Sequence, residues 1–335
     1  MSRKLNITVL VDATEVNESD PNFETSPEIP TTEYHVIEAL RDLGYKVSVL
    51  GAVNDIETIV KALTELNPDI VFNLTESFKG DRRFDKNIAG LLEMLGIRFT
   101  GSGAMGLMLC RDKRLCKELL SLHKIRVPNF FSLPHGRKCR VAKTIRYPLV
   151  VKPALEDGSE GISNASLVSD DTELEERVRF MHERWEQPAI AEEYIKGREL
   201  YVSILGNKRL VVLPIRECLF DFENKEGPQL ATYRVKWNAE YRKKWNIKFG
   251  HAELDPAVVK NISRICKRVY RIMHIRDYGR IDLRLTHDNK VVILEANPNP
   301  DLAYGEEVAE AAEKSGLSYE QFIDHILDHT LRRYK

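Results

Sequence analysis

The sequence predicts an α/β protein built in two parts, a parallel α/β domain followed by an α+β region with antiparallel strands. Two observations support this prediction. From residue 5 to residue 123, short apolar runs alternate with helical patterns, as they do in βαβ units whose strands lie parallel. Beyond Val127-Pro128, apolar runs follow one another across short turns, which is typical of antiparallel strands. At 335 residues, the chain is long enough for two or three domains of about 100–150 residues each.

The first part contains predicted strands and helices in strict alternation. In chain order they are the strand Leu5–Val11, the helix Thr31–Leu43, the strand Lys46–Leu50, the helix Ile56–Leu66, the strand Asp69–Asn73, the helix Ile88–Leu95 and the strand Ile97–Thr100. Gly44 and Gly96 follow two of the helices, as glycine commonly does at helix C-termini. The series therefore predicts a parallel sheet covered by helices on both faces.

Ligands of open parallel sheets bind at the carboxyl ends of the strands. Glu15 and Glu76 follow predicted strands at that edge, which makes them candidate substrate contacts. Glu15 lies in the polar segment Asp12–Pro30, which is too long for a plain connection. We therefore expect a substrate loop there, with a disordered insertion as the alternative.

The run Gly101-Ser102-Gly103-Ala104-Met105-Gly106 matches the G-x-G-x-x-G pattern of dinucleotide sites. It follows a late strand instead of the first one, and no strand ending in an acid comes about 20 residues later. A tight turn into a helix at Ala104–Leu109 fits better, and a further helix is predicted at Asp112–His123. The pattern G-x-x-x-x-G-K-[ST] does not occur in the sequence, so a nucleotide would not bind through a P-loop.

A strand with a lysine near its end opens the second part. Tyr147–Pro153 carries Lys152, and the loop Ala154–Ser163 that follows is rich in glycine and serine and contains Ser159. Backbone N–H groups of such a loop can surround phosphates while the ammonium group supplies a positive charge. Three strands are predicted to form an antiparallel sheet after it, the first two joined through Lys196-Gly197: Pro188–Ile195, Arg198–Ile204 and Leu210–Ile215.

The most informative segment spans residues 279–297. Two alternating apolar runs flank Asp288-Asn289, so the segment predicts a β-hairpin. A turn centred there places two pairs of residues opposite each other, Asp282 with Glu295 and Arg280 with Asn297. Like charges directly opposite one another destabilise a sheet, so the acid pair indicates a cation site, and oxygen ligands from few side chains suit Mg²⁺. The alternative is an exposed hairpin end whose acids face water.

The composition argues against several classes of partner. Fifty basic and 51 acidic residues leave a net charge of −1, so no polybasic surface for nucleic acid or an anionic membrane is expected. No apolar run approaches the about 18–20 residues of a membrane span. The five cysteines form no C-x-x-C pair, which favours a reducing cytoplasm and cysteines that act as small core residues.

From about Val71 to Asn297, the chain resembles the ATP-grasp superfamily and, within it, the D-alanine–D-alanine ligase branch. The motifs that carry this resemblance occur in the family's order: Val71-Phe72-Asn73, Thr100-Gly101-Ser102-Gly103, Asp112-Lys113, Val151-Lys152-Pro153, Glu192-Glu193-Tyr194-Ile195 with Glu199, Tyr233-Arg234-Val235-Lys236, Gly279-Arg280-Ile281-Asp282 and Leu294-Glu295-Ala296-Asn297. Each motif is weak alone, and their common order makes a chance match implausible.

The resemblance implies ligands for the nucleotide and the metal. The residues implied to bind ATP are Lys113, Lys152 and Ser159 at the phosphates, Glu192 with the backbone of Glu193 and Ile195 at the adenine, and Glu199 at the ribose. The residues implied to hold Mg²⁺, or Mn²⁺ in its place, are Asp282, Glu295 and Asn297.

The resemblance also implies two catalytic residues. Arg280 would face the phosphoryl group or the tetrahedral intermediate. Lys236 lies in what would be a mobile loop over Phe220–Gly250, and it would reach the γ-phosphate when that loop closes. The loop is rich in aromatic residues, which either exclude water as a lid or belong to an ordinary core.

The implied architecture is an ATP-grasp fold with an N-terminal α/β substrate domain at 1–110, a central subdomain at 111–200 and a C-terminal subdomain at 201–335, the last two clasping ATP. The implied reaction is carboxylate activation: ATP phosphorylates a carboxylate, and an amine attacks the acyl phosphate to give an amide, ADP and phosphate. The implied partners are small-molecule carboxylate and amine substrates and a second copy of the chain in a homodimer. A nucleotide-binding protein without ligation and a small-molecule kinase are the alternatives.

The sequence departs from the family's motifs in two segments that determine the substrate in that family. D-alanine–D-alanine ligases usually carry a Gly-Gly-x-Ser-x-Glu loop after the first strand, where this chain has Asp12-Ala13-Thr14-Glu15. After the metal motif they usually read Thr-Ser-Pro-Gly-Met, where this chain has Pro298–Leu302. Asp301 and Glu306 would repel the carboxylate of a second D-alanine. We therefore expect a ligase for another amino acid, peptide or specialised metabolite, with a genuine D-alanine–D-alanine ligase as the alternative.

Overall fold

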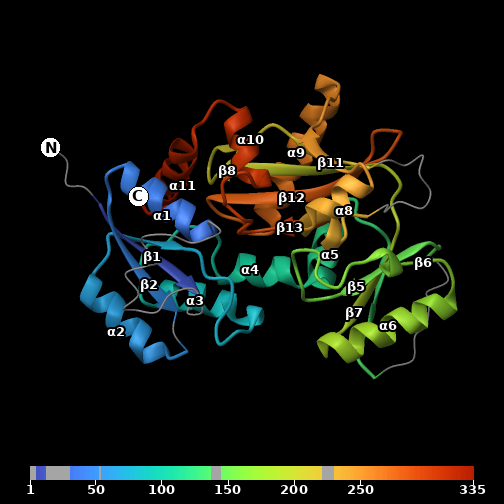
Figure 1. Ribbon diagram of the computed structural model, residues 1–335, viewed down its shortest axis with the longest axis horizontal. Helices are drawn as coiled ribbons and strands as arrows, with labels where there is room; N and C mark the ends of the chain where they lie inside the picture. Colours follow the sequence, from blue (N-terminus) through green and yellow to red (C-terminus); the bar gives the residue numbers. More distant parts are fainter. Residues whose placement is uncertain (1–4, 13–30, 53, 137–144, 221–229) are drawn as a thin grey trace.

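The computed structural model describes residues 5–12, 31–52, 54–136, 145–220 and 230–335. Its strands form one parallel sheet near the N-terminus and two antiparallel sheets after it, as predicted. Figure 1 shows three lobes, with the N-terminal sheet and α2 (Ile56–Leu66) on the left, α6 (Asp171–Trp185) and the central sheet at the lower right, and the C-terminal sheet above. Among the described helices, none combines the length and apolar character needed to cross a membrane.

The parallel sheet has the order β2-β1-β3. Its elements are β1 (Asn6–Asp12), α1 (Thr32–Asp42), β2 (Lys46–Ala52), α2, β3 (Ile70–Asn73), a 3-10 turn (Arg82–Phe84), α3 (Asp85–Met94) and α4 (Ala104–Arg111). The strand β1 lies in the middle because it is apolar on both faces. Ile7 and Val9 pack towards α1, whereas Leu10 packs with residues of α2 and α3.

The predicted strand Ile97–Thr100 is wrong. Phe99 makes only an isolated parallel bridge to Val71, although the Val71 N–H donates to Arg98 O over 2.8 Å and the Thr100 N–H donates to Val71 O over 3.0 Å. The chain then turns at Gly101, so the segment is too short to extend the ladder. The run from Gly101 to Gly106 makes the expected tight turn into α4.

The central sheet has the order β4-β7-β5-β6. Its elements are β4 (Phe130–Leu133), β5 (Leu149–Pro153), a 3-10 turn (Asn164–Ser166), β6 (Leu167–Val168), α6 and β7 (Ala189–Glu193). The helix α6 covers one face, where Leu174 and Met181 pack against Leu149 and Val151. Side chains alternate along a strand, so Lys152 points to the opposite face.

The prediction that Pro188–Ile195 and Arg198–Ile204 share one sheet is wrong, because β7 and β8 (Arg198–Gly206) lie in different sheets. The chain crosses between them at Gly197, whose φ is 151° and where a Cβ atom would lie 2.2 Å from the Leu285 carbonyl oxygen. Only glycine fits this close approach. The third predicted strand is shorter than expected, since β9 (Leu210–Val212) pairs with β8 alone.

The C-terminal sheet has the order β11-β10-β8-β12-β13, with β9 beside β8. Its other elements are β10 (Arg216–Leu219), β11 (Lys248–His251), α9 (Pro256–Ile272), β12 (Tyr278–Leu285) and β13 (Val291–Asn297). Leu120 of α5 (Lys113–Leu122) and Cys266 of α9 pack against Ile281 and Ile293 on one face of the sheet. The opposite face is left for polar side chains of β12 and β13.

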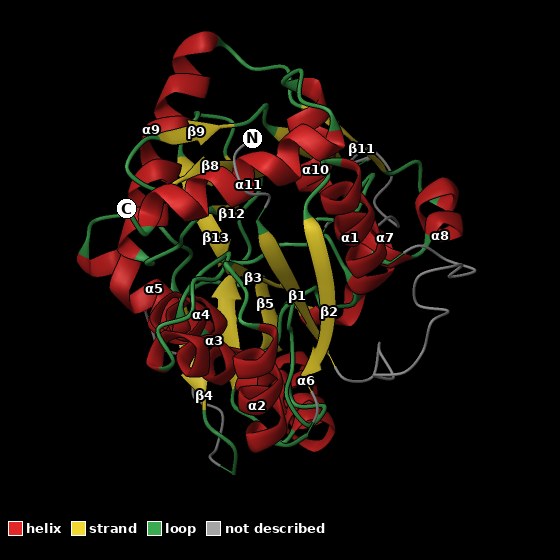
Figure 2. Ribbon diagram, turned by 90° about the vertical axis from the view of Figure 1, so that its left-hand side faces the viewer, coloured by secondary structure: helices red, strands yellow, loops and turns green. Residues whose placement is uncertain are grey.

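The last two helices return to the beginning of the chain. They are α10 (Glu307–Lys314) and α11 (Tyr319–Arg333). Phe322 and Ile326 of α11 belong to the same buried cluster as Ile7 of β1 and Val36 of α1. Figure 2 shows α1 beside β2, and α11 contacts α1 and β8. The C-terminus therefore closes the core of the N-terminal domain, a contact that local sequence patterns did not indicate.

The predicted hairpin register is confirmed at the end that carries the charged residues. Two pairs lie opposite each other, Asp282 with Glu295 and Arg280 with Asn297. Nearer the turn, Leu283 pairs with Ile293, so Leu294 forms a bulge. Leu285 pairs with Val291, so the turn is centred on Asp288 instead of between Asp288 and Asn289. This shifts the pairing by one residue, and the extra residue Leu294 shifts it back, so that Asp282 and Glu295 are paired as predicted. Bulges often aim side chains at functional sites.

The segment predicted as a mobile loop contains regular structure where it is described. It includes α7 (Tyr233–Trp237), α8 (Ala239–Lys244) and the first residues of β11, whereas residues 221–229 lie outside the described part of the chain. The core role is confirmed for two of its aromatic residues, and the lid role stays a prediction for two others. Tyr241 and Trp245 pack in a buried cluster with Tyr201, and Tyr233 and Trp237 are 50% and 52% exposed.

The carboxylate of Asp277 joins three parts of the chain. It accepts hydrogen bonds from the Gly101 N–H at 2.9 Å, from Asn207 Nδ2 at 2.7 Å and from Arg333 Nη2 at 2.8 Å. Asp277 is fully buried, and the Arg333 side chain is 15% exposed. One acid thus connects the turn before α4, the end of β8 and the C-terminal helix.

We predict that Asp277→Ala lowers the free energy of unfolding by about 3 kcal/mol, because it leaves the partly buried Arg333 without a counter-charge. Denaturant unfolding followed by circular dichroism measures the change. The matched control is Asp328→Ala, which breaks an exposed pair with Arg332 on the same helix and should cost about 0.5 kcal/mol or less. Equal losses in the two variants would contradict the assigned role of Asp277.

Candidate active site

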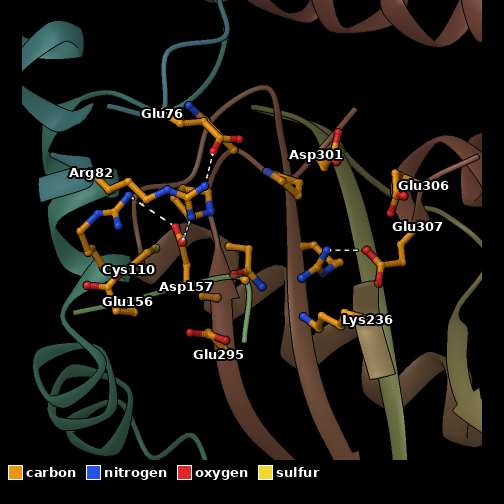
Figure 3. Close-up of a pocket in the computed structure, with 18 of the residues that line it drawn as sticks. Glu76, Arg82, Cys110, Glu156, Asp157, Lys236, Glu295, Asp301, Glu306 and Glu307 are labelled. Carbon is orange, nitrogen blue, oxygen red and sulfur yellow. Dashed lines mark hydrogen bonds and ion pairs between the residues drawn. The ribbon is translucent and has the colours of Figure 1, made fainter. Parts of the chain in front are cut away.

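A cavity of about 500 Å³ opens where the three lobes meet. Figure 3 shows its acids and bases from several elements: Glu76, Arg82, Glu156 and Asp157 on one side, Glu295 below, and Lys236, Asp301, Glu306 and Glu307 on the other side. Neither serine nor histidine occurs among its described lining residues. Cys110 lines it, but burial raises the pKa of this thiol well above its ordinary value. The cavity is therefore suited to neutralising charge, and it offers no activated nucleophile among these residues.

Arg280 is fixed between two carboxylates. Its Nε and Nη2 donate to Asp282 over 2.8 and 3.1 Å, and its Nη1 donates to Glu307 over 2.8 Å. The three side chains are 7–14% exposed. Burial alone would lower the pKa of Arg280, but Asp282 and Glu307 keep it above its ordinary value. The strand β12 thus presents a rigid positive group to the cavity.

Glu295, opposite Asp282, is neutralised from other segments of the chain. The Lys113 Nζ lies 2.7 Å from the Glu295 carboxylate and also donates to the Glu156 carbonyl. Burial would raise the pKa of Glu295, yet Lys113 and Lys152 bring it well below its ordinary value. Glu295 therefore carries a full negative charge that lysines from two other elements balance.

A buried cluster beside this pair contains Lys117, Lys152 and Glu192. Each lysine Nζ lies near Glu192 Oε1, at 3.2 Å for Lys117 and 3.1 Å for Lys152. That oxygen nevertheless accepts no hydrogen bond within the described structure. The Lys117 Nζ donates to the Leu294 carbonyl over 2.5 Å, and burial lowers its pKa. The sequence interpretation missed Lys117, although it lies one helical turn after Lys113 on α5.

Glu199 on β8 is also paired with a residue that the sequence interpretation missed. Arg284 forms a short ion pair with the Glu199 carboxylate, and the Tyr201 hydroxyl donates to the same carboxylate over 3.1 Å. Arg284 is 2% exposed. Its spacing was an available signal, because Arg280, Asp282 and Arg284 alternate on one face of β12.

The glycine-rich loop after β5 is fastened to the segment that carries Lys236. Ser159 Oγ donates to Ala231 O over 2.9 Å, the Tyr233 N–H donates to Ile162 O over 3.1 Å, and Trp237 Nε1 donates to Gly158 O over 3.2 Å. Lys236 lines the cavity from α7. The loop and α7 thus form one wall of the site.

The structure separates the predicted site residues into two groups. Those that line the cavity are Glu76, Lys113, Lys236, Arg280, Glu295, Asn297, Asp301 and Glu306. Those that lie away from its walls are Lys152, Ser159, Glu192, Glu193, Ile195, Glu199 and Asp282. The Glu193 carboxylate accepts from the Arg146 N–H at 2.8 Å and from Asn129 Nδ2 at 3.0 Å, so its side chain is already engaged there. Ile195 is half-buried in the crossing between the two antiparallel sheets.

The predicted substrate acids differ in their surroundings. Glu76 pairs with Arg82 at 2.8 Å. Asp301 accepts from the Thr32 hydroxyl at 2.6 Å and from the Ala303 N–H at 2.8 Å, so it also shapes its own loop. Burial raises the pKa of Glu306 to about 7, and the negative charges of Glu307 and Asp301 add to this shift. Glu15 lies outside the described residues.

The donor set of the hairpin suits a small divalent cation. Two opposed carboxylates and the Asn297 amide oxygen supply oxygen ligands. Within the described residues there is no cluster of three or more His, Cys, Asp or Glu side chains that could enclose a metal alone. Such a partial set fits Mg²⁺, which takes further ligands from water and phosphates.

Comparisons with known proteins place this chain in a family. The family model for the D-ala D-ala ligase C-terminus matches residues 122–328. The D-alanine–D-alanine ligase of Bordetella petrii is 31% identical over 250 residues, which cover 72% of this chain and 71% of that protein. An uncharacterized protein of Sinorhizobium fredii, y4sG, is 32% identical over 304 residues, which cover 89% of this chain and 87% of that protein.

Solved structures agree with the fold. The D-alanine–D-alanine ligase of Bacillus anthracis, crystallised in complex with ATP, superposes with a TM-score of 0.74 at 21% identity over 98% of both chains. The chain belongs to the D-alanine–D-alanine ligase family and has the ATP-grasp fold, as its motifs predicted. The expected class, an ATP-dependent ligase that forms C–N bonds, is confirmed with it.

We predict that Glu295→Gln lowers the free energy of unfolding by about 3 kcal/mol at pH 7, because Lys113 loses its counter-charge in a largely buried site. The pKa of Glu295 is lowered in the folded state, so its contribution is present above the unfolded pKa of about 4.3 and is lost as the pH falls below it. The difference between the two proteins should therefore shrink below about pH 4.

Denaturant unfolding at several pH values measures this difference. The control Glu118→Gln removes an exposed pair with Arg114 and should cost about 0.3–0.5 kcal/mol. A Glu295→Gln protein as stable as the unmodified protein at pH 7 would contradict the assigned charge balance.

Proposed function

We propose that this protein activates a substrate carboxylate as an acyl phosphate, at the expense of ATP, and joins it to an amine. The observation that carries the proposal is the meeting of the hairpin carboxylate Glu295 with Lys113, Lys236 and Arg280 at one cavity. Asp282 lies directly behind Arg280, which it holds through two hydrogen bonds. Phosphoryl transfer asks a protein for positioning and charge neutralisation more than for a covalent nucleophile. The chemistry of the lining matches that need.

In this proposal ATP lies between the central and C-terminal sheets. Glu192 Oε1 would accept from the adenine amino group, since it has lysine neighbours but no hydrogen bond. Glu199 would accept from the ribose hydroxyls, because a carboxylate has more acceptor positions than Arg284 and Tyr201 occupy. The backbone of Glu193 and Ile195 would flank the ring.

The phosphates would be held by Lys113, Lys152 and the backbone of the loop around Ser159. Asp282, Glu295 and Asn297 would hold Mg²⁺ or Mn²⁺, which would offset the negative charge of the phosphates. Lys113 pairs with Glu295 in the present structure, so binding would move this ammonium group from the carboxylate towards the phosphates.

Two residues would act on the reacting groups. Arg280 would stabilise the negative charge that develops when the amine attacks, because Asp282 and Glu307 already fix its guanidinium group. Lys236 would neutralise the transferring phosphoryl group from α7. The hydrogen bonds between α7 and the glycine-rich loop would keep this wall closed and exclude water from the acyl phosphate.

The acids at the far end of the cavity suggest the acceptor. Asp301, Glu306 and Glu307 all line it there, and Arg280 already engages Glu307. A partly buried acidic wall disfavours the carboxylate that a second D-alanine would bring and favours a neutral or positive group. We propose an amino acid, peptide or specialised metabolite other than D-alanine as the acceptor, with Glu76 on the opposite side of the cavity also facing substrate.

We further propose a division into 1–110, 111–200 and 201–335 and a homodimer in the cytoplasm. The family resemblance supports the division and the dimer. The buried, free thiols of Cys110, Cys116, Cys218 and Cys266 support a reducing compartment. Light scattering on the purified protein tests the dimer, and a monomeric mass would contradict it.

Incubation with Mg²⁺, ATP and an array of amino acids, amines and dipeptides tests the function, with phosphate release and product mass as readouts. We expect phosphate release only when a carboxylate and an amine are both present, together with a product heavier than either substrate. A phosphorylated product would indicate a kinase. No turnover with any pair would indicate a binding protein. Efficient formation of D-alanyl-D-alanine would show that the protein is a genuine D-alanine–D-alanine ligase.

We predict that Glu306→Gln raises the KM for a positively charged acceptor about tenfold at pH 8, where the carboxylate is ionised, and has little effect at pH 6. The sign follows from the raised pKa of about 7, since Glu306 gains its charge as the pH rises through that value. Steady-state kinetics of both proteins across this range measure the effect.

Two controls separate this role from a general loss of fold. Glu313→Gln removes an exposed charge from α10, the helix that follows Glu306, at a position outside the cavity, and should leave the KM unchanged. With D-alanine as acceptor, Glu306→Gln should increase phosphate release. An equal KM change at both pH values would contradict the prediction.

A further inference from the structure

A second cavity, of about 800 Å³, lies apart from the candidate active site and shares no described lining residue with it. It is bordered by the end of α5, by the connection from α5 to β4, by α9 and by the turn between β12 and β13. The helices α5 and α9 contact each other there. The proposed function makes no use of this cavity.

The lining of this cavity has one sign of charge. Its basic residues are Lys124, Arg126, Arg264, Arg268 and Lys290, and its described lining contains no acidic residue. They come from three separate elements, so the cluster does not reflect one helix face alone. For a chain whose net charge is −1, this is a marked local excess of positive charge.

Most of these charges lack a carboxylate partner in the part of the chain that the structure describes. Lys290 pairs with Asp288 at 2.6 Å. Arg268 donates to the His123 carbonyl over 3.1 Å, and Arg264 donates to the Asn261 side chain over 2.9 Å, so neither contact cancels a charge. Within the described residues, no ion pair involves Lys124 or Arg126. One carboxylate therefore offsets five positive groups.

The arrangement has an energetic cost. Arg264 and Arg268 are one turn apart on α9, where like charges destabilise a helix by about 0.2–0.5 kcal/mol. Lys124 has a φ of 56° at the end of α5, a conformation in which a non-glycine residue costs about 1–2 kcal/mol. The dipole of α5 favours a cation at Lys124. It does not account for Arg264 or for Lys290, which lie on other elements.

We propose that this cavity binds a compound that carries two or more linked phosphate groups. Guanidinium groups bind phosphate oxygens through paired hydrogen bonds, and Arg126, Arg264 and Arg268 supply three of them around one hollow. Several cations spread over a space of this size match a polyanion better than a single small anion. The proposal is independent of the ligase reaction, because it concerns other residues and another cavity.

Isothermal titration of the full chain with inorganic tripolyphosphate at low salt tests the proposal. The double variant Arg264→Gln/Arg268→Gln should weaken binding at least tenfold. The matched control is Lys260→Gln/Arg271→Gln, which removes the same charge from exposed positions of the same helix that do not line the cavity, and it should change the affinity less than about twofold. Circular dichroism of both variants confirms that α9 is retained.

Each outcome decides the question. Equal weakening in both double variants would mean diffuse attraction to a basic surface and would overturn the proposal. Binding that survives Arg264→Gln/Arg268→Gln but is lost in Lys152→Ala would place the anion in the candidate active site and would also overturn it. A parallel titration with CTP identifies the source of the phosphates, since tighter binding than tripolyphosphate indicates a nucleotide and equal or weaker binding indicates free polyphosphate.

Discussion

The opposition of Asp282 and Glu295 across one hairpin is the constraint on which the rest of this molecule depends. Two carboxylates directly opposite each other on paired strands repel, so each needs a positive group close to it. Arg280, on the same strand, forms an ion pair with Asp282. Lys113, at the start of α5, forms an ion pair with Glu295. Lys152 of the central sheet also lowers the pKa of Glu295. These ion pairs and close charges therefore hold the central sheet, α5 and the C-terminal sheet together at the hairpin.

The same balance explains how a site for ATP can exist before ATP binds. The two lysines that would contact phosphates form ion pairs with carboxylates in this structure, Lys113 with Glu295 and Lys152 with Glu192. In the proposed function, an anionic nucleotide with its divalent cation would replace both halves of the Lys113–Glu295 pair, and Lys117 would remain beside Glu192 when Lys152 contacts a phosphate. Breaking a pair by mutation has no such compensation. If the proposed site is correct, binding and folding rely on one set of charges, and the ion pairs preorganise the site.

Patterns that repeat locally were predictable from the sequence, and contacts between distant segments were not. Alternation and turn residues gave the βαβ order and the pairing of Asp282 with Glu295, although a bulge at Leu294 was needed to preserve that pairing. The change of sheet at Gly197 was missed because it depends on the Leu285 backbone, far away in sequence. In the site, the motifs led to Lys113, Arg280 and Glu295, which line the cavity. Lys117 and Arg284 were overlooked because their importance lies in the carboxylates with which they pair.

A crystal structure with Mg²⁺ and a non-hydrolysable ATP analogue tests the central claim most directly. The account predicts that Lys113 leaves Glu295, now 2.7 Å away, and contacts a phosphate oxygen. The metal should then lie between Asp282, Glu295 and Asn297, with Arg280 still held by Glu307. A bound nucleotide that leaves the Lys113–Glu295 pair intact, with the metal away from both hairpin carboxylates, would contradict the account.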